Sequence, residues 1–83
     1  MWSIEIQSTA KKRLSRMSRE ERGRILRAIY GLKDNPFVHD LKPMRGLPLW
    51  RLRIGRWRVL LKLDIQKRTI TILTVGARGD IYK

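Results

Sequence analysis

Four arginines lie close together in one short stretch of this 83-residue chain, and three of them are predicted to share one surface. Residues 50 to 58 read WRLRIGRWR. The alternation of apolar and cationic residues predicts a strand with one buried face and with Arg51 and Arg53 on the other face. Gly55 predicts a tight turn, after which Arg58 returns beside them on the next strand. Because guanidinium groups stay charged near neutral pH and match phosphate oxygens, the cluster predicts a site for a polyanion.

The net charge indicates the same class of partner. The chain has 20 lysines and arginines against seven acidic residues, a formal charge of +13. This excess predicts a nucleic acid, or else an acidic protein, as the partner. With no cysteine and one histidine, a disulfide scaffold or a zinc cluster is excluded, so we expect no metal and no cofactor. No apolar run approaches the roughly 18 residues of a membrane span, and we expect a single cytoplasmic domain over residues 1–83 that does not bind membranes.

The first third of the chain predicts a strand and two helices. Alternation over residues 2–6 indicates a short strand, and a hydroxyl at residue 8 or 9 then caps a helix that runs to about Met17. Ser18 and Glu21 have the spacing of a capping box, so a second helix begins there and ends before the Asp-Asn-Pro sequence. The apolar residues at helical spacing are expected to form the core: Ala10, Leu14, Met17, Ile25, Leu26, Ile29 and Leu32.

The rest of the chain predicts strands. Residues 35–46 are interpreted as a surface connection, and strands are expected over residues 49–54, 57–63 and 69–75. The middle strand is apolar on much of both faces and is therefore expected at the centre. The predicted fold class is α+β, in which an N-terminal strand, a two-helix hairpin and a three-stranded antiparallel meander form one sheet packed on the helices. The sheet face without helices would carry the arginines.

Four segments in this order resemble the RelE/ParE superfamily of toxins of type II toxin–antitoxin systems, and most closely its RelE branch. They are LKPMRG at residues 41–46, WRLRIGRWRV at 50–59, VGAR at 75–78 and DIY at 80–82. The resemblance covers nearly the whole chain, and it implies the RelE-like arrangement of helices and strands.

RelE-type toxins cleave messenger RNA in the ribosomal A site without a metal, by attack of the ribose 2′-hydroxyl on the adjacent phosphorus. The resemblance therefore implies a ribosome-dependent endoribonuclease, or mRNA interferase. The implied partners are the ribosome, mRNA and a cognate antitoxin, with operator DNA bound only through the antitoxin complex. Arginines held on strands would stabilise the charge that develops on the phosphate and on the leaving oxygen. Carried over by position, the implied catalytic residues are Arg51, Arg53, Arg58, Arg78 and Tyr82, and we expect further RNA contacts from Lys42, Arg45 and Arg56.

The identity of the general base is less well determined than the phosphate contacts. Well-known members of the family carry lysines where this chain has Arg51 and Arg53, and an arginine cannot be deprotonated in a protein. Tyr82 remains as a proton acceptor, provided that cations such as Arg78 lower the pKa of its phenol from about 10. The alternative is that Tyr82 simply packs on the sheet.

Two other functions use the same fold. One is a ParE-like toxin that inhibits DNA gyrase by binding, without phosphate chemistry. The other is an inactive homologue that serves mainly in an operator-binding complex with its antitoxin.

Overall fold

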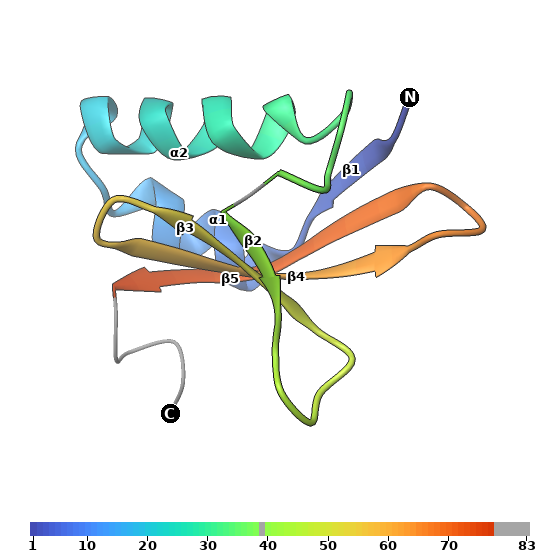
Figure 1. Cartoon of the computed structure of the whole chain (residues 1–83). Coiled ribbons are helices and arrows are strands. Elements are labelled where there is room, and N and C mark those ends of the chain that lie inside the picture. The colour runs from blue at the N-terminus through green and yellow to red at the C-terminus, as the bar shows by residue number, and fades with distance from the viewer. Residues whose placement is uncertain (39, 78–83) are drawn as a thin grey trace.

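The protein folds as one mixed β-sheet with two helices, as a computed structural model describes for residues 1–38 and 40–77 (Figure 1). In chain order the elements are β1 (Ser3–Ile6), α1 (Ser8–Ser15), α2 (Arg19–Gly31), β2 (Leu41–Pro43), β3 (Trp50–Ile54), β4 (Trp57–Asp64) and β5 (Thr69–Ala77). The sheet order is β1-β5-β4-β3-β2. The predicted α+β class is confirmed, and neither helix of the described chain is long and apolar enough to cross a membrane.

Strands β2 to β5 form an antiparallel meander, and β1 joins its far edge parallel to β5. Gly55 allows the tight turn between β3 and β4, because glycine adopts its φ of 59° without the steric cost that a side chain would add. A bulge near Leu60 shifts the pairing of β4 with β5, so that Leu60 faces Thr74 whereas Leu61 faces Ile72. Because this shift reverses the alternation along β5, Val75 rather than Thr74 turns into the core.

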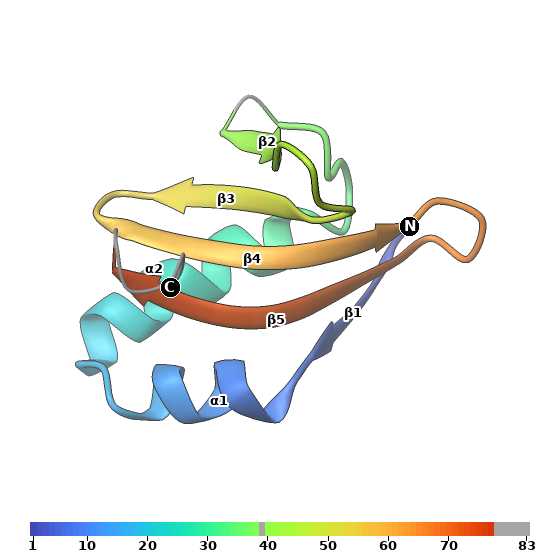
Figure 2. The same cartoon turned by 90° about the horizontal axis from the view of Figure 1, so that it is seen from below.

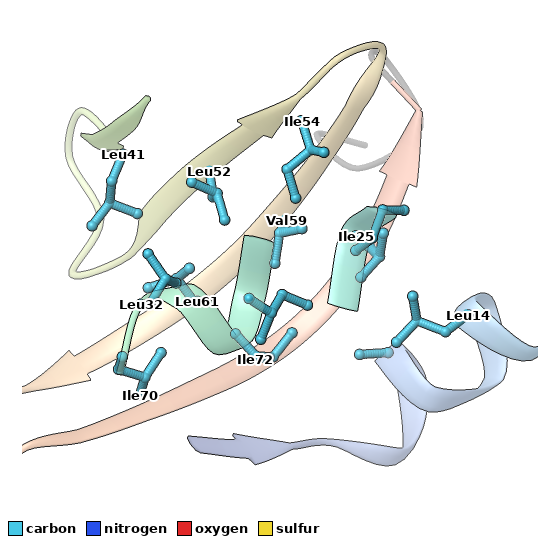
Figure 3. Packing of buried hydrophobic residues seen from close by; sticks show 13 residues of the cluster. Leu14, Ile25, Leu32, Leu41, Leu52, Ile54, Val59, Leu61, Ile70 and Ile72 are labelled. Carbon is cyan, nitrogen blue, oxygen red and sulfur yellow. The ribbon is translucent and has the colours of Figure 1, made fainter. Parts of the chain in front are cut away.

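Helix α2 covers one face of the sheet, and Figure 2 shows it behind β3, β4 and β5 when the other face is viewed. Ile25 and Ile29 of α2 are fully buried. They belong to one apolar cluster with residues of the three central strands (Figure 3), namely Leu52, Ile54, Val59, Leu61, Ile70, Ile72 and Val75. Helix α1 packs against β5 and adds Ala10 and Leu14 to the cluster. The core predicted from helical spacing is thus confirmed, with Met17 and Leu26 at its margin.

The start of α2 forms as the capping pattern predicts. The backbone N–H of Glu21 donates to the hydroxyl oxygen of Ser18 at 3.1 Å. The Glu21 carboxylate bonds instead to Arg56, whose Nη2 lies 3.2 Å from Oε1. The turn between β3 and β4 is therefore attached to the first turn of α2.

Several boundaries differ from the sequence prediction, among them the end of β5, which the structure describes as far as Ala77 rather than residue 75. The prediction of a surface connection over residues 35–46 is wrong in part, because Leu41–Pro43 form β2. This strand is too short to show an alternating pattern, and it forms because Leu41 is buried opposite Leu52 of β3. Helix α1 ends at Ser15, two residues before the predicted end, because the last turn closes with bonds between residues three apart, such as Arg16 N–H to the Arg13 carbonyl.

Candidate nucleic-acid interface

The face of the sheet opposite α2, called here the open face, gathers the cationic side chains of β2, β3 and β4. Cross-strand pairing places Lys42 beside Arg51, and Arg53 beside Arg58. Side chains at directly paired positions project to the same side about 5 Å apart. These four residues therefore form one patch, the arginine patch, and the strands hold their backbones in fixed positions.

The members of the patch differ in how they are held. Arg51 is exposed. Arg53 bonds to Asp40, with 3.2 Å between Nη2 and Oδ1, although its side chain remains 63% exposed. Arg58 is half-buried, and its Nη1 donates to the carbonyl oxygens of Gly55 and Trp57 at 3.0 Å each. Arg58 is thus the most firmly oriented guanidinium of the patch.

On its other side Arg58 pairs directly with Gly76 of β5, which is buried and has no side chain that could compete for the guanidinium. The arrangement suits binding of phosphate and stabilisation of negative charge, because each guanidinium presents several N–H donors.

The structure does not place the other predicted residues in the arginine patch. Arg45 is exposed in the connection between β2 and β3, which projects on the side away from α2 (Figure 1). Arg56 instead bonds to Glu21 of α2, and its guanidinium carbon lies 5.0 Å from the centre of the Trp57 ring. Its predicted contact with RNA remains a prediction, and its guanidinium is held away from the patch. Arg78 and Tyr82 lie outside the described residues, and the description of β5 ends at Ala77.

Sequence analysis missed two residues of β4 on this face. Lys62 pairs with Thr71 and is exposed, and Leu60 pairs with Arg51 and Thr74 and is half-buried. The alternation that places Arg58 on the open face also places residues 60 and 62 there. Because the strand is apolar on much of both faces, its sequence did not show which face residues 60 and 62 share with Arg58. No cluster of metal-binding side chains occurs within residues 1–38 and 40–77.

Comparisons with known proteins identify the fold. No family model and no curated protein matches the sequence. Solved structures do match, among them the RelBE2 toxin–antitoxin complex of Mycobacterium tuberculosis, with 22% identity and a TM-score of 0.83 over 93% of this chain and 98% of that one. The RelE–RelB complex of Pyrococcus horikoshii has 24% identity and a TM-score of 0.79, over 95% and 97% of the two chains.

The isolated RelE toxin of E. coli superposes equally well. It shares 16% identity and a TM-score of 0.79 with this protein, over 99% of this chain and 92% of that one. Agreement over nearly the full length of both chains confirms the architecture that the sequence motifs implied. The chain therefore has the fold of the RelE toxins.

Proposed function

We propose that this protein is the toxin of a type II toxin–antitoxin pair and cleaves mRNA on the ribosome. The arginine patch is the observation that carries the proposal. It places four cations on one rigid surface that no helix of the described chain covers, in a fold shared with RelE toxins. A net charge of +13 favours the approach to ribosomal RNA as well as to the message.

The proposed reaction needs no group other than side chains and water. The ribose 2′-oxygen bonds to the adjacent phosphorus to give a 2′,3′-cyclic phosphate, the bond from phosphorus to the 5′-oxygen breaks, and the 5′-oxygen takes up a proton from water. Arg58, fixed by its two carbonyl acceptors, stabilises the charge that develops on the phosphate oxygens. Arg51 and Arg53 bind the same phosphate or the adjacent phosphate of the RNA strand. We assign removal of the 2′-hydroxyl proton to Tyr82, with Arg78 stabilising the phenolate.

The proposed partners follow from the same surface. Several of the matching structures are toxin–antitoxin complexes. We infer a cognate antitoxin for this chain, with an acidic segment that covers the arginine patch and blocks RNA. Operator DNA would be bound through that complex, and ribosomes and mRNA place the activity in the cytoplasm.

The test is cleavage of a translated mRNA by purified protein and ribosomes, mapped by primer extension. Arg58→Ala is expected to lower the cleavage rate by about a hundredfold or more, the usual effect of removing one group that stabilises the transition state. Arg27→Ala is the matched control, since Arg27 is an exposed arginine of α2 on the other side of the molecule. Equal rates for the parent and Arg58→Ala would refute the catalytic role of the patch.

The same preparations separate the other candidate functions. A parent protein that leaves mRNA intact but inhibits DNA supercoiling by gyrase would show a ParE-like toxin. A protein that does neither, and arrests no growth when induced without an antitoxin, would be an inactive homologue. Either outcome would overturn the proposal.

A further inference from the structure

A second feature of the open face lies beyond the arginine patch, at the end of the sheet where β4 turns into β5. A hollow of about 580 Å³ is formed there by residues of β1, β4, β5 and the connection between β4 and β5. That connection lies at the end of the sheet far from the β3–β4 turn (Figure 2). Its volume lies in the range of sites that hold small organic ligands. Its lining includes Glu5, Lys62, Asp64, Ile65, Thr69 and Thr71.

Strand pairing explains why these side chains meet. Thr71 pairs with Glu5 on one side and with Lys62 on the other, so all three project from one face of the sheet. Asp64 pairs with Thr69 in the next row. The Asp64 carboxylate also accepts the backbone N–H of Lys67 at 3.0 Å, which fixes its orientation.

The chemistry of the hollow differs from that of the arginine patch. The carboxylates of Glu5 and Asp64 stand beside two lysines, Lys62 and Lys67, and two hydroxyls, so the site offers acceptors as well as donors and attracts a phosphate less than the patch does. Ile65 adds an apolar surface, since its side chain is 60% exposed. A neutral group with a flat apolar face and a polar edge fits this lining best, and a nucleobase with its ribose has that character.

The open side of β4 connects the two sites. Arg58, Leu60 and Lys62 alternate along it, and the four steps from Arg58 to Lys62 span about 13 Å at the usual rise of a strand. Leu60 offers an apolar step between the two cations. A single RNA strand bound by phosphate at Arg58 can therefore run over Leu60 and reach Lys62 at the border of the hollow.

We propose that the hollow binds the nucleoside of a nucleotide that flanks the cleaved linkage and contributes to sequence preference. The inference rests on the proposed function, because that function places RNA on the open face. It predicts two separable contributions to RNA binding. The arginine patch contributes the salt-dependent part, and the hollow contributes a base-dependent part.

The test measures binding of 2′-O-methylated RNA hexamers, which cannot be cleaved, by fluorescence anisotropy at several salt concentrations. The variant Glu5→Gln/Thr71→Val removes one charge and one hydroxyl from the hollow while it keeps the side-chain shapes. The matched control is Glu20→Gln/Thr9→Val, which makes the same exchanges at exposed helical positions. The hollow variant is expected to bind about fivefold to tenfold more weakly and to lose preference among hexamers of different sequence.

The salt dependence distinguishes the two sites. In the hollow variant the slope of log affinity against log salt is expected to equal that of the parent. In Arg58→Ala the negative slope is expected to become shallower by about 0.7. Unchanged affinity and unchanged base preference in the hollow variant would overturn the inference. The inference would also be overturned if the hollow variant lost affinity only through a shallower dependence on salt, because the hollow would then contact phosphate.

Failure of the proposed nuclease function gives a different result from failure of the nucleoside site. A parent protein that binds the hexamers with base preference but leaves translated mRNA intact would refute the nuclease and keep the nucleoside site. A parent that cleaves mRNA through Arg58 while the hollow variant cuts the same sites at the same rates would refute the nucleoside site alone.

Discussion

Two arginines of the same hairpin are expected to have different main roles, although the sequence predicts that both contact RNA. Arg51 projects from the open face of β3, whereas Arg56 bonds to Glu21 of α2 at 3.2 Å and lies over the Trp57 ring. We predict that Arg51→Ala weakens RNA binding and leaves stability unchanged. We predict that Arg56→Ala lowers stability and weakens RNA binding less than Arg51→Ala does.

The size of the first effect follows from the charges on the open face. Five cations lie there and are proposed to contact RNA, namely Lys42, Arg51, Arg53, Arg58 and Lys62. Each phosphate contact with a single strand contributes about 0.7 to the slope of log affinity against log salt, so the parent slope should be about −3.5 and that of Arg51→Ala about −2.8. One lost charge-assisted contact is worth about 1.5–3 kcal/mol, which is a loss of affinity of about tenfold or more at low salt.

The size of the second effect follows from the exposure of Arg56. Its side chain is 72% exposed, so the ion pair with Glu21 is screened by solvent and contributes less than about 1 kcal/mol. The contact with Trp57 adds about 0.5 kcal/mol at such a site. A total near 1 kcal/mol lowers the Tm of a domain of this size by about 4–8 °C.

The assays are anisotropy with a hexamer RNA between 50 and 200 mM salt, and thermal unfolding followed by circular dichroism. Arg27→Ala again serves as the control, because it removes the same charge from an exposed part of α2. A salt slope that falls equally in the Arg51, Arg56 and Arg27 variants would show that only net charge matters. That result would refute the reasoning that the open face is the binding surface.

Three further predictions concern stability and charge. Ile72→Ala is expected to lower the free energy of unfolding in urea by about 3–4 kcal/mol, because Ile72 is fully buried. Ile65→Ala, at an exposed position, should lower it by less than about 0.5 kcal/mol. Comparable losses in the two variants would contradict the described core. Ser18→Ala should cost about 1 kcal/mol in the same measurement, because it removes the cap of α2, and an unchanged midpoint would show that the cap is dispensable. Asp40→Asn should raise RNA affinity by about twofold to fivefold at low salt, because it removes the carboxylate that pairs with Arg53; an unchanged affinity would exclude Arg53 from the RNA surface.

Much of the fold was predictable because it depends on local patterns. The helical spacing of Ile25, Ile29 and Leu32 identifies the buried side of α2, since residues three and four apart lie on the same side of a helix. The hydroxyl of Ser18 marks the start of that helix. Alternation and Gly55 predict the hairpin of β3 and β4.

Strand β2 could not be predicted in the same way. Three residues are too few for a periodic pattern, and Pro43 argues against a strand. The segment becomes a strand because β3 offers it an unpaired edge and the core offers Leu41 a buried position. Both conditions come from residues distant in the sequence.

The sequence by itself determined the chemical character of this protein: many permanent cations, an amphipathic helix, and arginines that alternate with apolar residues on a strand. Only the tertiary structure decided that Lys42 joins the predicted arginines on one surface and that Arg56 does not. Arg56 lies on the side of α2 because Glu21, 35 positions earlier, accepts its hydrogen bond. The hollow likewise depends on the parallel pairing of β1 with β5, which brings Glu5 beside Thr71. Local patterns set the side on which a residue points, whereas long-range pairing sets its neighbours.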